Sequence, residues 1–365
     1  MALSPLFKPL SFAELPGWSS DQPAEAFAAF RRSAFHILTK GYRTGALGVA
    51  AEAFCDAYEH ARSEAKPDPR SFFERWFVPC RVSPAPRSHG FVTGFYEPTA
   101  KASRVRSNIF RYPLYARPAD LVDVTAGNRP AGMDPSFRFG RDTSSGVKEY
   151  FDRAAIEKGA LEGRGLEIAW LADPVDLFFI HVQGAARLEM VDGGTMRVTY
   201  AAKSGHPFTG PGGVLRDLGE IPAAEITMQS IRAWLRSNPH RRDEILHRNR
   251  SFIFFREAPV DDPSLGPVAA AKVPLTPGRS IAVDRELHTF GTPFFIDAPS
   301  LKASDGSPFR RLMIAQDTGS AIIGPARGDL FTGSGDDAGE IAGIIRHPAD
   351  FYALLPRQLI ESVAR

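Results

Sequence analysis

Residues 315–331 read AQDTGSAIIGPARGDLF, a run that sets two aspartates beside apolar stretches. Asp317 ends a stretch that predicts a buried strand, and Asp329 stands directly before Leu330 and Phe331. A carboxyl group at the end of a buried strand is partly desolvated, which raises its pKa and keeps it protonated near neutral pH. A general acid needs that protonated state. Asp329 and Asp317 are therefore candidate catalytic residues, with glycine-rich loops predicted beside them to admit a bulky substrate.

This run has two other interpretations. Asp-Thr-Gly at 317–319 and Gly-Asp at 328–329 are ordinary turn sequences. Asp-Thr-Gly also occurs in aspartic proteases, but those enzymes need two such triplets or a dimer that pairs the carboxylates. One triplet in 365 residues argues against that class.

The run VTGFYEP at 92–98 is a second candidate site. It offers the hydroxyl of Thr93, the flexible backbone of Gly94 and the ring of Tyr96. Aromatic rings beside polar groups suit sugars, whose C–H faces stack on the ring while their hydroxyls find polar partners. These three residues are predicted to bind substrate, and the alternative is a strand with core aromatics.

Two further runs place polar groups after apolar segments. The run FFIHVQGA offers Gln183 and Gly184 as substrate contacts, while the apolar neighbours of His181 are typical of a core histidine. The run YAAKSGHP offers Lys203 in a polar loop, and the alternative is a solvated turn.

Hydrophobic periodicity and turn residues predict a chain that begins helical and then becomes rich in strands. Ser20 or Asp21 is the expected cap of the first helix. Short strands and many turns favour a barrel over a parallel α/β sheet, so the predicted fold class is mainly β with peripheral helices. Helices are predicted at 27–38, 47–62, 71–77, 173–178, 223–237 and 241–248, and strands at 91–96, 109–115, 166–171, 185–191, 196–200, 252–256, 280–284, 293–297 and 312–317, with loops at 118–148.

Composition narrows the function classes. The length allows two compact domains, and 43% hydrophobic and 24% charged residues predict a packed core. The net charge is +2 without a basic run, so nucleic acid is not a predicted partner. No apolar stretch of about 18 residues predicts a transmembrane segment. Cys55 and Cys80 are too few for a disulfide scaffold and lack metal-ligand spacing; buried free thiols are slightly favoured over a single bridge.

Taken in order, the polar runs resemble the membrane-bound lytic murein transglycosylase A family. The resemblance covers roughly residue 85 to the end, and the ordered set is specific although each run is short. The runs that carry it are TGFYEP (93–98), YPLY (112–115), DPVDLFF (173–179), VQG (182–184), KSGH (203–206), MQSI (228–231), NRSFIFF (249–255), VPLTP (273–277), the 317–331 segment and GDDAGEIAG (335–343).

That resemblance implies a double-psi β-barrel interrupted by a second, mostly β domain, with a deep groove between the two. We expect the barrel domain and its N-terminal helices to comprise residues 1–100 and 250–365, and the inserted domain to comprise residues 101–249.

The resemblance also implies roles for the acidic residues. Asp329 takes the position of the family's catalytic acid, and Asp317 that of a second aspartate that supports it through hydrogen bonds. A third acidic position falls at Asp336 or Asp337, and Asp337 joins the predicted substrate-binding residues. Ser320 and Thr332 stand where the family more often has glycine and an aromatic residue, which affects details of the groove.

The implied activity is non-hydrolytic cleavage between N-acetylmuramic acid and N-acetylglucosamine, with Asp329 as acid and then base, and with no cofactor or metal. Peptidoglycan strands are the expected partner, the chain is expected to be a monomer, and the expected location is the periplasm or cell envelope. Residues 1–16 show neither a signal-peptide pattern nor a lipoprotein cysteine. The alternatives are a glycoside hydrolase that uses Asp329 and Asp317, or a non-catalytic murein-binding protein.

Overall fold

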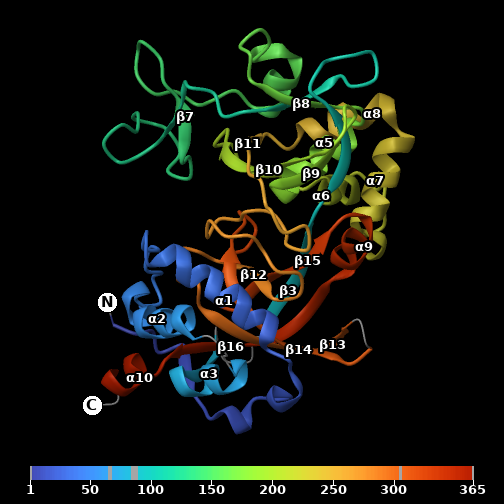
Figure 1. The fold of residues 1–365 in the computed structure, drawn as a ribbon. Coiled ribbons are helices and arrows are strands. Elements are labelled where there is room, and N and C mark those ends of the chain that lie inside the picture. Colours follow the sequence, from blue (N-terminus) through green and yellow to red (C-terminus); the bar gives the residue numbers. More distant parts are fainter. Residues whose placement is uncertain (1, 65–67, 84–88, 304–305, 364–365) are drawn as a thin grey trace. The chain divides into compact units, whose positions relative to one another are not determined.

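The structure, a computed structural model, describes residues 2–64, 68–83, 89–303 and 306–363. The chain forms two compact units, each built from segments that are distant in sequence (Figure 1). The barrel unit comprises Met1–Tyr96, Val260–Gly333 and Asp337–Arg365, and the insert unit comprises Glu97–Pro259 and Ser334–Asp336.

An eight-stranded sheet forms the centre of the barrel unit. It closes on itself because β16 pairs with β3 in addition to its neighbours β2 and β13. Most pairs are antiparallel, but β12 and β14 run parallel. In sheet order the strands are β1 (Phe7–Pro9), β2 (Phe77–Val82), β16 (Arg346–Pro356), β13 (Pro293–Lys302), β14 (Pro308–Asp317), β12 (Ser280–Val283), β15 (Arg327–Ser334) and β3 (Gly90–Glu97).

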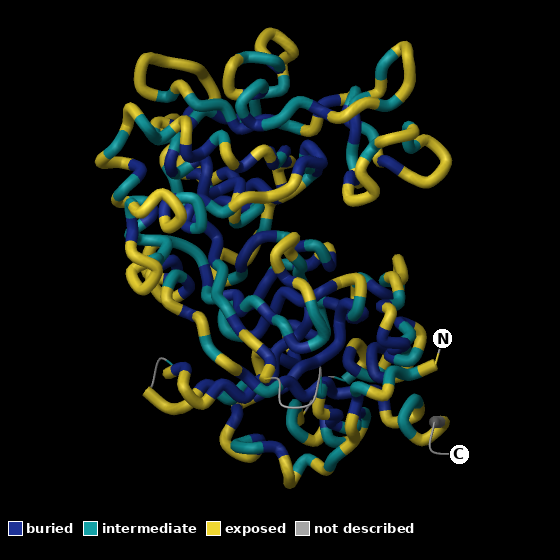
Figure 2. Tube along the Cα trace, turned by 180° about the vertical axis from the view of Figure 1, so that it is seen from behind, coloured by how far each residue is buried: buried dark blue, intermediate teal, exposed yellow. Residues whose placement is uncertain are grey.

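The N-terminal helices pack on this sheet through aromatic side chains. Phe30 of α1 (Ala24–Ile37) contacts Tyr58 of α2 (Cys55–Ser63) and Phe73 of α3 (Pro69–Trp76). All three rings are fully buried and belong to the same hydrophobic core as the barrel strands. The burial of such rings stabilises this unit. Figure 2 shows the buried backbone running through its centre, with exposed segments at the periphery.

A buried ion pair fastens the start of α1 to the barrel and corrects the predicted cap. Asp21 does not cap the helix, whose N-cap residue is Pro23. Its carboxylate instead accepts hydrogen bonds from Arg279 Nη1 at 2.9 and 3.1 Å and from the amide of Leu312 at 2.8 Å. Further along α1, Gln316 Nε2 of β14 donates to the carbonyl of Ala29 at 2.9 Å.

A six-stranded sheet forms the insert unit. The predicted hairpin is confirmed, since β9 and β10 pair in antiparallel register from Ala185↔Thr199 to Glu189↔Thr195. Gly193 and Gly194 supply the positive φ angles of 98° and 82° that the turn needs. The strand order is β11 (Ile253–Glu257), β10 (Thr195–Lys203), β9 (Ala185–Met190), β4 (Thr99–Ser103), β8 (Glu167–Leu171) and β5 (Tyr112–Tyr115).

Four helices of the insert unit share one apolar core, which contains Val175, Phe178, Leu215, Leu235 and Leu246. They are α5 (Pro174–Gln183), α6 (Pro211–Asp217), α7 (Met228–Ser237) and α8 (Pro239–His247). The helix α4 (Arg153–Ala155) begins at Asp152, whose side chain accepts from the amide of Ala155 at 3.0 Å.

The predicted fold class, mainly β with peripheral helices, is confirmed. Several boundaries were wrong. The helix predicted at 173–178 continues to Gln183, and the segment predicted as loop at 118–148 contains a small sheet of β6 (Leu121–Asp123) and β7 (Phe139–Arg141). The sequence also gave no prediction for β15, for β16, or for the helices α9 (Asp336–Ile344) and α10 (Arg357–Val363).

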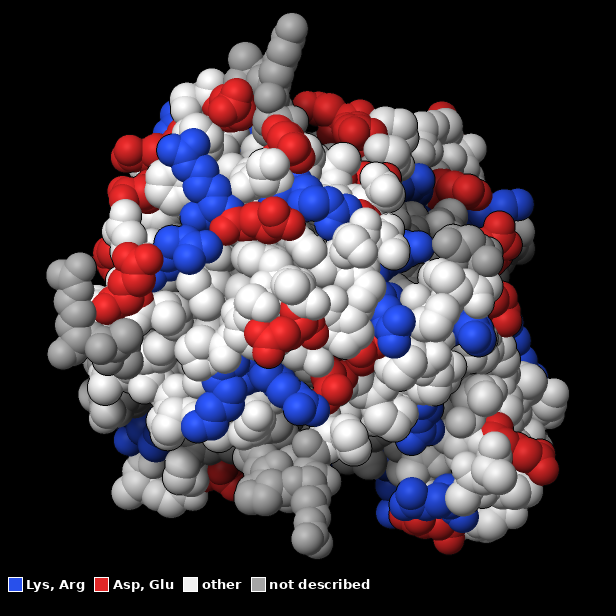
Figure 3. Space-filling model, turned by 90° about the horizontal axis from the view of Figure 1, so that it is seen from below, with Lys and Arg blue, Asp and Glu red and all other residues white. Residues whose placement is uncertain are grey.

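Charged side chains of both signs are interspersed on the face drawn in Figure 3. Cys55 is half-buried, Cys80 is buried, and both thiols are free. Within the described part of the chain, no helix combines the length and the apolar character needed to cross a membrane.

Candidate active site

Three neighbouring strands place the two candidate catalytic carboxyl groups on one face of the barrel sheet. In the central strand β12, Ala282 is the register partner of Asp317 in β14 on one side and of Asp329 in β15 on the other. The register of β12 and β14 shifts between Ile281 and Ala282, and the charge of Asp329 acts on Asp317 across these strands. Two strand spacings separate the outer Cα atoms by roughly 10 Å.

Asp329 is half-buried in the middle of its strand. Its Oδ1 accepts a hydrogen bond of 2.5 Å from the hydroxyl of Thr93 in β3. Burial raises the pKa of Asp329, while the Thr93 hydrogen bond and the charge of Arg327 act in the opposite direction. Burial dominates, so the protonated form of Asp329 is favoured relative to a solvated aspartate.

Asp317 is the second carboxyl group of this face. Burial, with a contribution from the charge of Asp329, raises the pKa of Asp317 to about 6. Hydrogen bonds from the backbone of Thr318 and Ala270, the latter 3.2 Å from Oδ1, and the charge of Lys272 limit that rise. The ionised form of Asp329 thus disfavours ionisation of Asp317.

Arg327 completes the polar group around Asp329. Its Nη2 donates to Thr93 Oγ1 at 2.7 Å, its Nη1 donates to the carbonyl of Gly328, and its guanidinium lies 5.8 Å from the centre of the Phe91 ring. Sequence reasoning assigned no role to Arg327. The available signal was its position two residues before Asp329, because residues i and i+2 of a strand share a face.

The other predicted residues of the 92–98 run pack against α9. A Cβ atom on Gly94 would lie 2.8 Å from Ala342 Cα, and one on Gly339 would lie 2.8 Å from the ring of Tyr96. Gly94 and Tyr96 therefore fix the distance between β3 and this helix, whereas Thr93, on the opposite face of the strand, meets Asp329. Asp337 lies at the exposed start of α9.

The remaining predicted substrate contacts lie in the insert unit. Gln183 is the last residue of α5, and Gly184 ends that helix with a φ angle of 74°. Lys203 ends β10, where burial and the charge of Arg138 lower its pKa. The structure thus brings Thr93 and Arg327 to Asp329, and it places Gln183, Gly184 and Lys203 in the other unit, where their role in binding stays a prediction.

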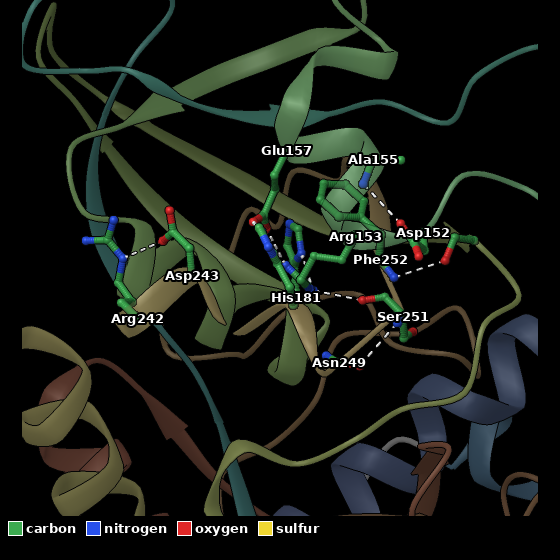
Figure 4. Close-up of polar contacts among 12 residues, drawn as sticks. Asp152, Arg153, Ala155, Glu157, His181, Arg242, Asp243, Asn249, Ser251 and Phe252 are labelled. Atoms are coloured by element: carbon green, nitrogen blue, oxygen red, sulfur yellow. Dashed lines mark hydrogen bonds and ion pairs between the residues drawn. The ribbon is translucent and has the colours of Figure 1, made fainter. Parts of the chain in front are cut away.

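The interpretation of His181 as a core histidine is confirmed, and its surroundings are drawn in Figure 4. Its Nδ1 lies 3.1 Å from Arg153 Nη2, and because a guanidinium only donates, this nitrogen accepts and the ring is neutral. Arg153 also donates to Glu157 at 2.8 Å and to the carbonyl of Ser251 at 2.9 Å. Burial is the main cause that lowers the pKa of His181, with a contribution from the charge of Arg153.

The loop that follows β14 is anchored at its far end. Asp284 Oδ2 accepts from the amide of Gly324 at 2.9 Å, and His288 Nε2 lies 2.8 Å from the carbonyl of Pro325. Burial lowers the pKa of His288 to about 4, so that its ring is neutral and donates to Pro325. These contacts fix the chain just before Arg327 enters β15.

Within residues 2–64, 68–83, 89–303 and 306–363, no group of three or more His, Cys, Asp and Glu side chains is arranged to hold a metal ion. The polar groups around Asp329 are those of proton transfer: one carboxyl group with a raised pKa, one hydroxyl and one guanidinium.

Two family models match the chain. Residues 91–256 match the MltA specific insert domain, and residues 279–355 match the 3D domain. The first match covers most of the insert unit and β3, and the second covers the strands that carry Asp317 and Asp329.

Solved structures and curated proteins give the same family. A membrane-bound lytic murein transglycosylase from Agrobacterium tumefaciens is 52% identical, with a TM-score of 0.91 over 98% of this chain and 99% of that chain. Escherichia coli MltA with bound chitohexaose is 26% identical, with a TM-score of 0.69 over 97% and 96% of the two chains. The curated membrane-bound lytic murein transglycosylase A of Escherichia coli K12 is 32% identical over 268 residues, which span 72% of this chain and 64% of that relative.

Proposed function

This chain belongs to the membrane-bound lytic murein transglycosylase A family, and we propose that it cleaves peptidoglycan glycan strands without water, with Asp329 as the proton donor and acceptor. The names of the relatives support the reaction class. The complex of a relative with chitohexaose supports a β-1,4-linked amino-sugar chain as the ligand.

The observation that carries the proposal is the environment of Asp329. Its carboxyl group is half-buried, its pKa is raised by burial, and one of its oxygens is held by the hydroxyl of Thr93. A carboxyl group in such a setting is protonated at a pH where a solvated aspartate is ionised, as a general acid requires.

The proposed reaction uses this one group twice. Protonated Asp329 gives its proton to the glycosidic oxygen between N-acetylmuramic acid and N-acetylglucosamine as the bond from that oxygen to C1 of the muramic residue breaks. The ionised Asp329 then takes the proton of the C6 hydroxyl of the same sugar, and the C6 oxygen forms the new bond to C1. The products are a 1,6-anhydromuramic end and a free N-acetylglucosamine end.

A single protein carboxyl group suffices because the nucleophile belongs to the substrate. The C6 hydroxyl is tethered to the reacting ring, so its effective concentration is high without a bound water molecule. The part left to the protein is to hold one protonated acid at the leaving oxygen and to stabilise the positive charge that develops at C1.

Hydrolysis is the second candidate function, and the position of Asp317 favours considering it. Asp317 and Asp329 flank Ala282 on one face of the sheet. Inverting glycosidases separate their two carboxyl groups by about 6.5–9.5 Å to admit water. In that mechanism Asp329 would be the acid and Asp317 the base. A non-catalytic murein-binding protein would release no fragment at all.

Mass spectrometry of fragments released from purified sacculi tests the proposal. Transglycosylation gives anhydromuropeptides, whose mass is one water lower than that of the hydrolysed muropeptides. Asp329→Asn retains the shape of the side chain and removes the proton that is transferred, so it should abolish release. Fragments that have gained water, or an active Asp329→Asn enzyme, would overturn the proposal.

The proposed location follows from the relatives. Their names describe membrane-bound proteins, which supports association with the cell envelope, and the proposed substrate lies in the periplasm. Cell fractionation with an antibody to the full-length natural protein tests this location.

A further inference from the structure

We propose that Arg327 is a positioning residue, which acts through Thr93 to confine the transferable proton of Asp329 to its Oδ2 atom. The inference rests on the proposed function of Asp329 and extends it from the identity of the acid to the oxygen that performs both proton transfers. It follows from the direction of two consecutive hydrogen bonds.

The direction of the first hydrogen bond is fixed by chemistry. Arg327 Nη2 lies 2.7 Å from Thr93 Oγ1. A guanidinium has only donors, so Thr93 Oγ1 must be the acceptor. The hydroxyl of Thr93 then has one proton of its own to donate.

That proton points to Asp329. Thr93 Oγ1 is 2.5 Å from Asp329 Oδ1, within the range of a short hydrogen bond between a hydroxyl and a carboxyl group. Because the Thr93 proton occupies this contact, Oδ1 accepts, and a proton on Oδ1 would compete with it. Neutral Asp329 therefore carries its proton on Oδ2, and the rotation of the carboxyl group is restricted by the bond to Oδ1.

Two neighbours hold Arg327 in this geometry. Its Nη1 donates to the carbonyl of Gly328, and its guanidinium lies over the ring of Phe91, which is 37% exposed. Phe91, Thr93, Arg327 and Asp329 alternate along β3 and β15, so that their side chains share one face of the sheet. The guanidinium is thus oriented from two sides before any substrate binds.

The arrangement suits an acid that must become a base. In the first step the proton leaves Oδ2, and the resulting carboxylate keeps the hydrogen bond from Thr93 and the nearby charge of Arg327. In the second step Oδ2 recovers a proton from the C6 hydroxyl. Neither Thr93 nor Arg327 exchanges a proton with the substrate, and so neither is a catalytic residue.

Matched substitutions test the inference on the full chain with purified sacculi. Thr93→Val removes the hydroxyl at nearly constant volume, and Thr93→Ser keeps it. Arg327→Gln removes the charge, and Arg327→Lys keeps a cation that only donates. We expect Thr93→Val and Arg327→Gln to reduce kcat roughly tenfold or more, the cost of losing a charge-assisted hydrogen bond, while Thr93→Ser and Arg327→Lys recover part of the loss.

The pH profile separates positioning from mere structure. Activity that requires protonated Asp329 falls as pH rises through its pKa. The Thr93 hydrogen bond and the Arg327 charge both lower that pKa, so Thr93→Val and Arg327→Gln should move the alkaline limb of kcat to higher pH. Arg346→Gln is the control. The Cα atom of Arg346 pairs with that of Thr93 across β16 and β3, but the Arg346 side chain is exposed. The alkaline limb of kcat should therefore stay in place in this variant.

The inference is overturned if Thr93→Val and Arg327→Gln, with thermal unfolding like that of the wild type, leave the alkaline limb unmoved, or if Thr93→Ser behaves like Thr93→Val. Misfolding of one variant leaves the other pair to decide. Failure of the proposed function is a separate outcome, because it appears as water-containing products from the wild-type enzyme whatever the limb does.

Discussion

Asp21 and Asp329 of the barrel unit each lie close to an arginine, and the two sites differ in how the arginine reaches the carboxyl group. Asp21 contacts Arg279 directly, at 2.9 and 3.1 Å, with exposed fractions of 2% and 5% for the two side chains. Asp329 is separated from Arg327 by the hydroxyl of Thr93. In the direct buried pair, the guanidinium donates to both carboxylate oxygens. An intervening hydroxyl orients the carboxyl group and lets it take up a proton, and this difference distinguishes a structural aspartate from a candidate acid.

The largest effect expected from breaking this contrast is at Asp329. Asp329→Asn should reduce the release of anhydromuropeptides at least roughly 10³-fold, because general acid catalysis and the return of the proton are both lost. Its free energy of unfolding should stay close to that of the wild type, since a half-buried amide can still accept from Thr93. Urea denaturation and muropeptide analysis of the same preparation measure the two quantities.

At Asp21, substitution should lower stability and leave activity nearly unchanged, the reverse of the result expected at Asp329. Asp21→Asn leaves the buried charge of Arg279 with the more distant, exposed carboxylate of Glu25, 3.7 Å away, and we expect a loss of about 3 kcal/mol in the free energy of unfolding. The activity of the molecules that remain folded should be nearly unchanged. Asp350→Asn is the matched control, because it breaks an ion pair of 3.0 Å between Asp350 and Arg81. The side chain of Asp350 is 30% exposed and that of Arg81 is 51% exposed. Exposed pairs contribute about 1 kcal/mol or less, so equal losses at both sites would contradict this account.

The contrast also shows what sequence could not reveal. The 315–331 run identified Asp317 and Asp329 as candidates through their apolar neighbours, and β14 does end at Asp317. The cap assigned to Asp21 was wrong, because its ion pair with Arg279 joins residues 258 positions apart. Local patterns carry no record of such a distant partner.

One prediction that rested on a glycine of this region was wrong. Gly328 was expected in a flexible loop, but it lies inside β15, where a Cβ atom would be 2.5 Å from Ile281 Cδ1. No prediction was made for α9, in which a Cβ atom on Gly339 would lie 2.8 Å from the ring of Tyr96. Both glycines pack against residues distant in the chain, and a single sequence does not display such contacts.

Asp317 allows the effect of burial on a carboxyl group to be measured through the pH dependence of stability. Its folded-state pKa is about 6 against an ordinary 3.8, so between these values the folded chain binds a proton that the unfolded chain has lost. The stability that Asp317 contributes is therefore fully present below the pKa of the unfolded chain, and it is lost as the pH rises toward 6. Each pKa unit corresponds to about 1.4 kcal/mol. Because Asp317 is partly exposed, we expect its contribution to the free energy of unfolding to be about 2 kcal/mol.

Asp317→Asn should remove this pH dependence. The difference in unfolding free energy between wild type and variant should change by about 2 kcal/mol between pH 4 and pH 6, in favour of the variant at the higher pH. Denaturation at a series of pH values measures it. A constant difference would mean that Asp317 is ionised in the folded protein near pH 4. The variant should keep transglycosylase activity. If the enzyme instead hydrolyses its substrate with Asp317 as the base, the variant should lose its hydrolytic activity.

The smallest expected effect concerns β3, the strand that carries Thr93. Thr93 faces Asp329, and Gly94 faces α9, where an added methyl group would lie 2.8 Å from Ala342 Cα and 2.9 Å from Ile345 Cδ1. Gly94→Ala should cost about 1–2 kcal/mol by overpacking. It should also lower kcat severalfold, because relief of the clash moves β3 and lengthens the bond from Thr93 to Asp329.

Gly127→Ala provides the comparison for that substitution, since the nearest atom to its added methyl group, Thr125 Oγ1, is 3.8 Å away. A combined Gly94→Ala and Thr93→Val variant separates the two contributions. If strand displacement acts on kcat only through the hydroxyl, Gly94→Ala will have no further effect on kcat in the Thr93→Val background, although it will still lower the free energy of unfolding. Independent, additive losses in kcat would instead place the effect of Gly94 outside the hydrogen bond to Asp329.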